Sequence, residues 1–339
     1  MARELLSEIR VYSCVQIGMA ENMLKIAVLD DYQNVSKGLA DWGSLGREAE
    51  VTVFTQSFES EAAAIAALAD FDVLCLMRER MALSAQMIAQ LPKLKLINVT
   101  GARVRVIDVE AAKARGIPVC HTYAGESRHA TPELAWALIL AAARDLGDEH
   151  GNMRKGAWQE TIGTTLGGKT LGLVGLGKLG ARMVPIARAF EMDVIAWSAN
   201  LTEARAAEVG AKRVEKAELF ARADVVSLHL VLSDRSRGIV GAPEIGQMKE
   251  GAILVNTSRG PLIDEAALLS ALQSKRIRAG LDVYDVEPLP AAHPLRQAPN
   301  VVLTPHLGYV VKEAYGRFYQ DIVENIAAWR AGTPIRVLY

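Results

Sequence analysis

The feature that most constrains this chain is a regular alternation of short β-rich runs with helical segments. The first series of predicted strands comprises LKIAVLD, EVTVFTQ, FDVLCLM, LKLINVT and IPVCHT. The second comprises KTLGLVGLG, DVIAWS, ADVVSLHL, AILVNTS, AGLDVY and VVLTPH. Such alternation predicts right-handed βαβ crossovers and parallel sheets with helices on both faces. We therefore expect an α/β protein with two doubly wound parallel-sheet domains.

Two domains are expected because the chain has 339 residues, half of them apolar, which exceeds the usual size of a single core. We predict one domain from residues 23–123 and 310–339, and the other from residues 124–309. The stretch KEAYGRFYQDIVENIAAW near the C-terminus has helical periodicity and is expected to pack onto the first domain. Residues 1–22 lack the continuous apolar core of a signal peptide, and we expect them to be a disordered extension.

Capping residues predict where two helices begin and end. Ser84 is expected to cap the helix SAQMIAQL. The longer segment TPELAWALILAAARDLG is expected to begin with Thr131 as its N-cap and Pro132 in the first helical position. Gly147 is expected to end that helix.

Composition limits the kinds of partner. Lys and Arg total 38 against 39 Asp and Glu, which leaves no broad charged footprint for nucleic acid or a membrane surface. The longest apolar run, residues 134–143, is far shorter than the roughly 20 residues of a membrane helix. Cys14, Cys75 and Cys120 show no CxxC spacing, so we expect a cytoplasmic protein without a thiolate metal site. The expected partners are a small molecule and copies of the chain itself.

The run GLGKLG follows a predicted strand and opens a helical stretch. Its first glycine permits a tight turn, its second lets backbone amides approach a pyrophosphate, and its third permits close packing of helix and strand. An ordinary glycine-rich turn is the alternative, but the strand and helix around the run favour a Rossmann-type dinucleotide site. The residues predicted to bind this cofactor are Gly175, Gly177, Lys178, Leu179 and Gly180.

The position that would distinguish the two nicotinamide cofactors carries no acid. An Asp or Glu about 20 residues after the glycine run would hold the ribose hydroxyls of NAD and repel the 2′-phosphate of NADP. Here the second strand is followed by Ser198 and Asn200, and Arg205 lies a turn or more into the next helix. These two polar residues either hydrogen-bond the NAD ribose or leave room for NADP, so both cofactors stay open.

Three polar residues follow strands of the second series: Arg259 after AILVNTS, Glu287 after AGLDVYDV, and His306 after VVLTP. The carboxyl ends of parallel strands meet at one edge, so these side chains can converge. An arginine can hold a carboxylate and polarise a ketone, while a histidine beside a carboxylate can donate a proton as a hydride arrives. The alternatives are a surface ion pair for Arg259 and a turn position for Glu287.

The stretches GLGKLG, NTSRGPLIDEAALLSAL, AGLDVYDVEPLP and LTPHLG, in this order, resemble the signature segments of the D-isomer-specific 2-hydroxyacid dehydrogenase family. That resemblance implies hydride transfer between NAD or NADP and a small D-2-hydroxy acid or 2-keto acid, with Arg259, Glu287 and His306 as catalytic residues. It also implies a flavodoxin-like substrate-binding domain, a Rossmann-type dinucleotide-binding domain and a homodimer joined through the latter. Further residues assigned to the cofactor site are Ser198, Asn200, Ser236, Thr257, Ser258, Asp282 and Gly308.

Residues at the strand ends of the first sheet are expected to select the substrate. Gly101 and Ala102 are predicted to offer backbone amides to a carboxylate, as the corresponding loop of the family does. Arg78, Arg80 and Arg103 either recognise a second anionic group or pair with neighbouring acids. No HExxH motif or cluster of carboxylates indicates a metal site.

A binding protein of the same fold is the alternative to an enzyme. Corepressors related to the family use it to sense nicotinamide cofactors, and a fold alone does not fix function. Such proteins usually carry interaction segments, and the intact set of Arg, Glu and His favours an enzyme.

Overall fold

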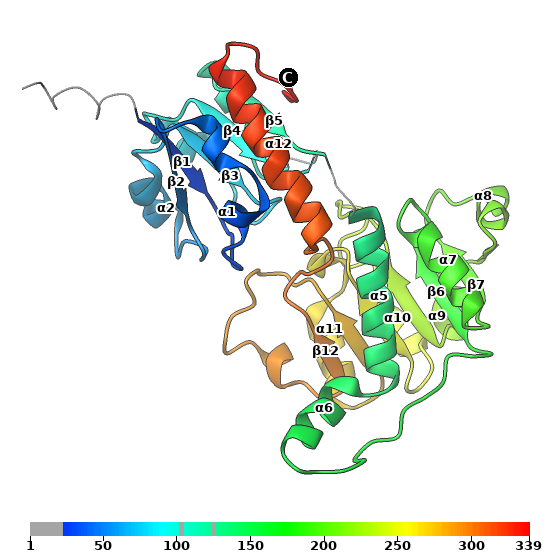
Figure 1. Ribbon diagram of the computed structural model, residues 1–339. Helices are drawn as coiled ribbons and strands as arrows, with labels where there is room; N and C mark the ends of the chain where they lie inside the picture. The colour runs from blue at the N-terminus through cyan, green and yellow to red at the C-terminus, as the bar shows by residue number, and fades with distance from the viewer. Residues whose placement is uncertain (1–22, 102–104, 124–126) are drawn as a thin grey trace, which may run out of the picture. The chain divides into compact units, whose positions relative to one another are not determined.

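The computed structural model describes residues 23–101, 105–123 and 127–339 (Figure 1). The predicted extension, residues 1–22, and the predicted substrate residues Ala102 and Arg103 lie outside the described residues. The chain forms two compact units: unit 1 consists of Met1–Tyr123 and Gly316–Tyr339, and unit 2 of Ala124–Tyr315.

Unit 1 is built on a five-stranded parallel sheet with the order β2-β1-β3-β4-β5, which is the flavodoxin-like order of a doubly wound sheet. All five strands lie within the segments predicted from the sequence or within one residue of them. They are β1 (Leu24–Val28), β2 (Ala49–Val53), β3 (Val73–Leu76), β4 (Leu96–Val99) and β5 (Val119–His121).

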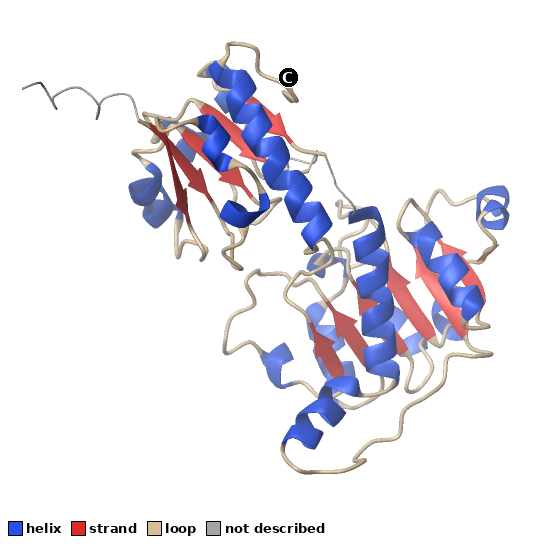
Figure 2. Cartoon of the chain, in the orientation of Figure 1, coloured by secondary structure: helices blue, strands red, loops and turns tan. Residues whose placement is uncertain are grey.

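Helices cover both faces of this sheet, as the blue and red elements of Figure 2 show. Successive side chains of a strand point to opposite faces of the sheet. Leu74 and Ile97 point to the face that is buried by α2, α3 and α4. Asn98 points to the opposite face, where the Nδ2 of Asn325 on α12 donates to its Oδ1 at 3.0 Å. The C-terminal helix therefore packs onto unit 1, as predicted. The elements are α1 (Ser36–Leu39), η1 (Trp42–Leu45), α2 (Glu61–Leu68), α3 (Ala85–Ala89), α4 (Val109–Ala114) and α12 (Lys312–Arg330).

Unit 2 contains a seven-stranded parallel sheet with the order β12-β11-β10-β9-β6-β7-β8. The order reverses between β6 and β9, which defines the switch point of a Rossmann-type sheet. The sequence did not predict β8, a two-residue edge strand too short to show a β-rich pattern. The strands are β6 (Thr170–Val174), β7 (Asp193–Trp197), β8 (Lys212–Arg213), β9 (Val225–Leu228), β10 (Ile253–Asn256), β11 (Arg278–Leu281) and β12 (Val301–Leu303).

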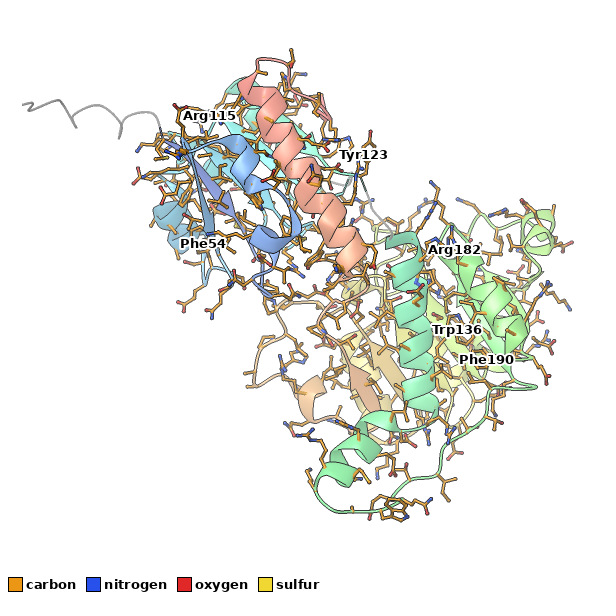
Figure 3. The ribbon with its side chains drawn as sticks, in the orientation of Figure 1. Phe54, Arg115, Tyr123, Trp136, Arg182 and Phe190 are labelled. Atoms are coloured by element: carbon orange, nitrogen blue, oxygen red, sulfur yellow. The ribbon has the colours of Figure 1, made fainter. Side chains whose placement is uncertain are left out.

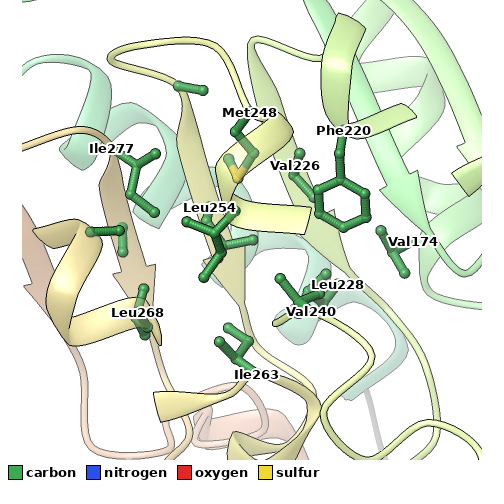
Figure 4. Close-up of a cluster of buried hydrophobic side chains, with 14 of the residues drawn as sticks. Val174, Phe220, Val226, Leu228, Val240, Met248, Leu254, Ile263, Leu268 and Ile277 are labelled. Carbon is green, nitrogen blue, oxygen red and sulfur yellow. The ribbon is translucent and has the colours of Figure 1, made fainter. Parts of the chain in front are cut away.

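Two apolar clusters bury the faces of this sheet. On one face Trp136 of α5 stacks on Phe190 with ring centroids 5.2 Å apart, beside α7 (Figure 3). On the other face Phe220 of α9 and Leu254 of β10 are fully buried in a cluster with side chains of α10 and α11 (Figure 4). The elements are α5 (Ser127–Ala143), α6 (Leu146–Arg154), α7 (Gly180–Ala189), α8 (Glu203–Glu208), α9 (Lys216–Arg222), α10 (Ala242–Gln247), η2 (Gly260–Leu262), α11 (Glu265–Gln273) and η3 (Pro294–Gln297).

The capping predictions had mixed outcomes. Ser84 caps α3, because its Oγ accepts from the amide of Met87 at 3.1 Å. The predicted ends of the long helix are wrong: α5 begins at Ser127, so Pro132 lies inside it. Asp145, with φ 49°, separates α5 from α6, and Gly147 lies within α6.

Tertiary contacts explain why the start of α5 was predicted wrongly. Thr131 does not cap the helix; its Oγ1 donates to the carbonyl of Gly308 at 2.7 Å. Pro132 removes one helical hydrogen bond, and the burial of the following residues, Ala135 and Trp136, offsets that loss. Within the described part of the chain, no helix combines the length and apolarity needed to cross a membrane.

Candidate active site

The glycine run forms the turn between β6 and α7. Gly175 has φ +100°, and a Cβ there would lie 2.7 Å from the carbonyl oxygen of His229. A Cβ on Gly180 would lie 2.2 Å from the carbonyl oxygen of Gly175, whereas one on Gly177 would meet nothing within 4 Å. The turn is therefore closed toward the protein and open above Gly177, which suits the close approach of a pyrophosphate at the start of a helix. Lys178 is exposed beside this opening, and Leu179 directly precedes α7.

His229 follows β9 at the switch point and packs beneath the glycine turn. Its Nε2 lies 2.9 Å from the Oγ of Ser227, and its Nδ1 is buried. Burial lowers the pKa of His229 to about 4, so its imidazole is neutral near pH 7. None of the sequence motifs singled out His229. The available signal was a histidine near the end of the strand predicted at ADVVSLHL.

Ser198 follows β7, where an acidic residue would hold the adenosine ribose. Its carbonyl accepts from the amide of Leu201 at 3.0 Å and closes an exposed turn that contains Asn200. Arg205 forms an ion pair with Glu208 at 2.7 Å within α8. The turn after β7 therefore presents hydroxyl and amide groups, and Arg205 is paired with a carboxylate.

His306 and Glu287 form a direct pair. The Nδ1 of His306 lies 2.5 Å from the Oε2 of Glu287, whose Oε1 accepts from the amide of Tyr284 at 2.9 Å. Burial alone would raise the pKa of Glu287. The hydrogen bond and charge of His306, with smaller effects of the Tyr284 amide and Arg259, outweigh it and hold the pKa below its ordinary value. Glu287 is thus a carboxylate at neutral pH, and it engages the Nδ1 side of the imidazole.

Arg259 follows β10 and lies in a loop fixed at several points. The Nδ2 of Asn256 donates to the carbonyl of Arg259 at 2.8 Å, and the Oγ of Ser258 donates to the carbonyl of Leu228 at 2.8 Å. A Cβ on Gly260 would lie 2.1 Å from the carbonyl carbon of Tyr284. Only glycine fits there, so the loop of Arg259 lies against the backbone that precedes Glu287.

Asp282 holds the loop that carries His306. One of its oxygens accepts from the Oγ1 of Thr304 at 2.6 Å and the amide of Leu307 at 2.7 Å, and the other accepts from the amide of Gly308 at 2.9 Å. Burial raises the pKa of Asp282, and these hydrogen bonds oppose the rise. Its hydrogen bonds fix the loop that carries His306, and the predicted contact of Asp282 with the cofactor stays a prediction.

The structure brings Arg259, Glu287 and His306 to the carboxyl edge of one sheet, as the strand positions predicted. Two other predicted cofactor residues are enclosed. The Oγ1 of Thr257 is buried without a hydrogen-bond partner among the described residues. The Oγ of Ser236 donates to the carbonyl of Val231 at 2.8 Å, which stabilises the loop after β9.

The predicted substrate residues of unit 1 lie at its strand ends and already make internal contacts. The amide of Gly101 donates to the Oγ1 of Thr122 at 2.9 Å, so it is not a free donor for a carboxylate. A Cβ on Gly101 would lie 2.5 Å from the Nη1 of Arg78, which places that guanidinium against the loop. The Nη1 of Arg80 donates to the carbonyl of Asp30 at 2.6 Å. Among residues that the structure describes, no group of three or more His, Cys, Asp or Glu is arranged to hold a metal.

A parallel doubly wound sheet with a glycine-rich turn at its switch point defines a dinucleotide-binding α/β protein. The profile described as "D-isomer specific 2-hydroxyacid dehydrogenase, NAD binding domain" matches residues 136–308. The chain belongs to the D-isomer specific 2-hydroxyacid dehydrogenase family. The resemblance inferred from the sequence motifs is thereby confirmed, and unit 2 carries the nicotinamide-binding domain.

Named relatives span several members of the family. A hydroxypyruvate reductase of Blautia hydrogenotrophica is 32% identical over 93% of this chain and 99% of its own. A D-3-phosphoglycerate dehydrogenase of Mycobacterium leprae is 37% identical over 79% of this chain, and the chain spans about half the length of such relatives, here 51%. The crystal structure of a phosphoglycerate oxidoreductase from Vibrio cholerae has a TM-score of 0.86 at 40% identity, covering 92% of this chain and 100% of the other.

Proposed function

We propose that this chain is an oxidoreductase that transfers a hydride between a nicotinamide cofactor and the 2-position of a small D-2-hydroxy acid or 2-keto acid. The observation that carries the proposal is the His306–Glu287 pair at 2.5 Å, with Arg259 on an adjoining loop of the same sheet edge. Family membership and the open glycine turn support it. No finding favours the corepressor alternative.

The three residues have distinct proposed tasks. The bound nicotinamide supplies or accepts the hydride. Arg259 binds the substrate carboxylate and polarises the 2-oxygen, because a guanidinium presents two parallel donors. In the reducing direction His306 gives a proton from Nε2 to that oxygen, and in the oxidising direction it removes one. Glu287 holds Nδ1 and stabilises the protonated ring in either direction.

A panel of 2-keto acids tests this function. Glyoxylate, hydroxypyruvate, pyruvate, phenylpyruvate and 2-ketoglutarate would each be offered with NADH and with NADPH, and cofactor oxidation followed. We expect turnover of at least one. Arg78, Arg80 and the loop at Gly101 are proposed to choose among these acids. Tight cofactor binding without turnover of any acid would contradict the enzyme and favour a nicotinamide sensor.

We further propose that Ser198 allows both cofactors to bind. Ser198→Asp is expected to lower kcat/KM for NADPH by about tenfold more than for NADH, because the new carboxylate would face a 2′-phosphate of like charge. The isosteric Ser198→Asn is the matched control, since it changes size in the same way without adding charge. Steady-state constants for both cofactors measure the effect. Equal losses for the two cofactors, or the same selectivity in both variants, would show that Ser198 does not select.

A homodimer formed through unit 2 is also proposed. Apolar side chains on α6 and the extended segment after it are exposed: Met153 by 57%, Trp158 by 71% and Ile162 by 91%. Glu149 holds this segment in place, because its Oε1 accepts from the amide and the Oγ1 of Thr161 at 2.6 and 2.7 Å. An ordered segment with large exposed apolar side chains is typical of a protein interface.

Ile162→Asp is expected to shift the protein from dimer to monomer, since burying an unpaired charge in an apolar contact costs several kcal/mol. Ile162→Leu, which keeps the apolar volume, is expected to leave the dimer intact. Sedimentation velocity at micromolar concentration would distinguish the two species. A wild type that sediments as a monomer would contradict the homodimer, and an unaltered dimer for the aspartate variant would place the interface elsewhere.

A further inference from the structure

We propose that Tyr309 is a positioning residue for His306, which fixes the plane of the imidazole through its aromatic ring. The two ring centroids lie 5.4 Å apart at an interplanar angle of 75°, an edge-to-face arrangement. Tyr309 is 4% exposed, and its ring lies 6.3 Å from that of Tyr315. The proposal rests on the proposed function and extends it beyond Arg259, Glu287 and His306.

One hydrogen bond does not orient an imidazole. The Nδ1 contact with Glu287 fixes one atom, but the ring can still tilt about that contact, and the χ2 torsion of histidine is broad and roughly two-fold. His306 has φ 56°, so its backbone already lies in the left-handed region. A neighbour packed edge-to-face against the ring restricts the tilt and keeps Nε2 aimed at one point.

Tyr309 can do this because its own loop is fixed. Gly308, the preceding residue, donates its amide to Asp282 at 2.9 Å and accepts from the Oγ1 of Thr131 at 2.7 Å. The amide of Val311 then donates to the carbonyl of Tyr309 at 3.0 Å. The backbone of Tyr309 is therefore held on both sides, and its ring acts as a rigid wall beside the imidazole.

The kinetic test compares two substitutions of Tyr309. Tyr309→Leu removes the aromatic wall and is expected to lower kcat about two- to tenfold, the range for one aromatic pair, with KM for the keto acid near wild type. Tyr309→Phe keeps the ring and is expected to restore kcat to within about twofold. Tyr315→Leu is the matched control, because it also removes a buried tyrosine ring. The ring of Tyr315 packs on Tyr309, whereas the ring of Tyr309 packs on His306. Rates would be expressed per cofactor-binding site, which corrects for any loss of folded protein.

A second readout does not depend on turnover. Selective ¹⁵N labelling of the six histidines, with the His306 signals assigned through His306→Gln, reports the ring directly. We expect one sharp set of His306 ring signals in the wild type and in Tyr309→Phe, and broadened or doubled signals in Tyr309→Leu. If the leucine variant does not fold, Tyr309→Met replaces it under the same criteria.

The outcomes separate the two proposals. A wild type without turnover contradicts the proposed function, while the ring signals still test Tyr309. An active wild type whose leucine variant keeps its kcat and a single set of His306 signals overturns the role of Tyr309 alone. An equal loss in Tyr309→Phe would assign the effect to the hydroxyl and also overturn the role of the ring.

Discussion

Replacing His306 with alanine is expected to lower kcat for keto acid reduction by about 100-fold or more, the scale of a lost general acid. The imidazole is the proposed proton donor, and Glu287 cannot take over because its pKa is held below the ordinary value. Cofactor affinity should stay near wild type, since the glycine turn lies on a different loop. Steady-state kinetics and titration of protein fluorescence with NADH would measure both quantities.

The chain offers a matched control for this variant. The Nε2 of His293 lies 3.2 Å from the Oε1 of Glu265, a second histidine–glutamate pair in unit 2. His293→Ala is expected to leave kcat within about twofold, although it removes the cap that accepts from the amide of Leu295. Similar losses in both variants would show that the effect of His306→Ala is structural and not catalytic.

Arg259→Lys is expected to lower kcat/KM by roughly 10- to 100-fold, although it preserves the charge. A lysine cannot present two parallel donors to a carboxylate and a carbonyl, and one lost hydrogen bond to a charged group accounts for about 1.5–3 kcal/mol. Arg278→Lys is the control, because Arg278 donates to the carbonyl of Ala142 at 3.0 Å and pairs with Asp145. It should change stability without changing kcat/KM. Wild-type constants for Arg259→Lys would exclude Arg259 from the substrate site.

The sequence was sufficient to predict the strands that carry the site. Parallel strands buried on both faces are rich in apolar residues, so each appeared as a distinct run, and the residues after them marked the sheet edge. Thr131 and Pro132 gave a wrong start for α5 because cap and proline signals are local, whereas α5 is held by contacts within unit 2, such as the hydrogen bond of Thr131 to Gly308 and the burial of Trp136. β8 carried no apolar pattern at all.

The contacts between loops were beyond sequence reasoning. The prediction for Asp282 named only the cofactor, and the structure adds hydrogen bonds to Thr304 and to two amides of the His306 loop. The contact of Gly260 with the backbone of Tyr284 joins two loops whose spacing depends on how the strands fold, and the edge-to-face packing of Tyr309 on His306 depends on how their shared loop is held. These contacts cannot be predicted from a single sequence, because the presence of a glycine or a tyrosine does not reveal which residue it contacts.

The hydrogen bonds around Asp282 have a consequence for how the substrate preference of such a chain can change. The described bonds that fix Arg259, Glu287 and His306 all come from residues of unit 2. Substitutions at the strand ends of unit 1, such as Arg78 or Arg80, leave those bonds untouched. On the proposed function, a chain built this way can exchange one acid for another through changes in unit 1, while the residues proposed for proton transfer in unit 2 stay the same.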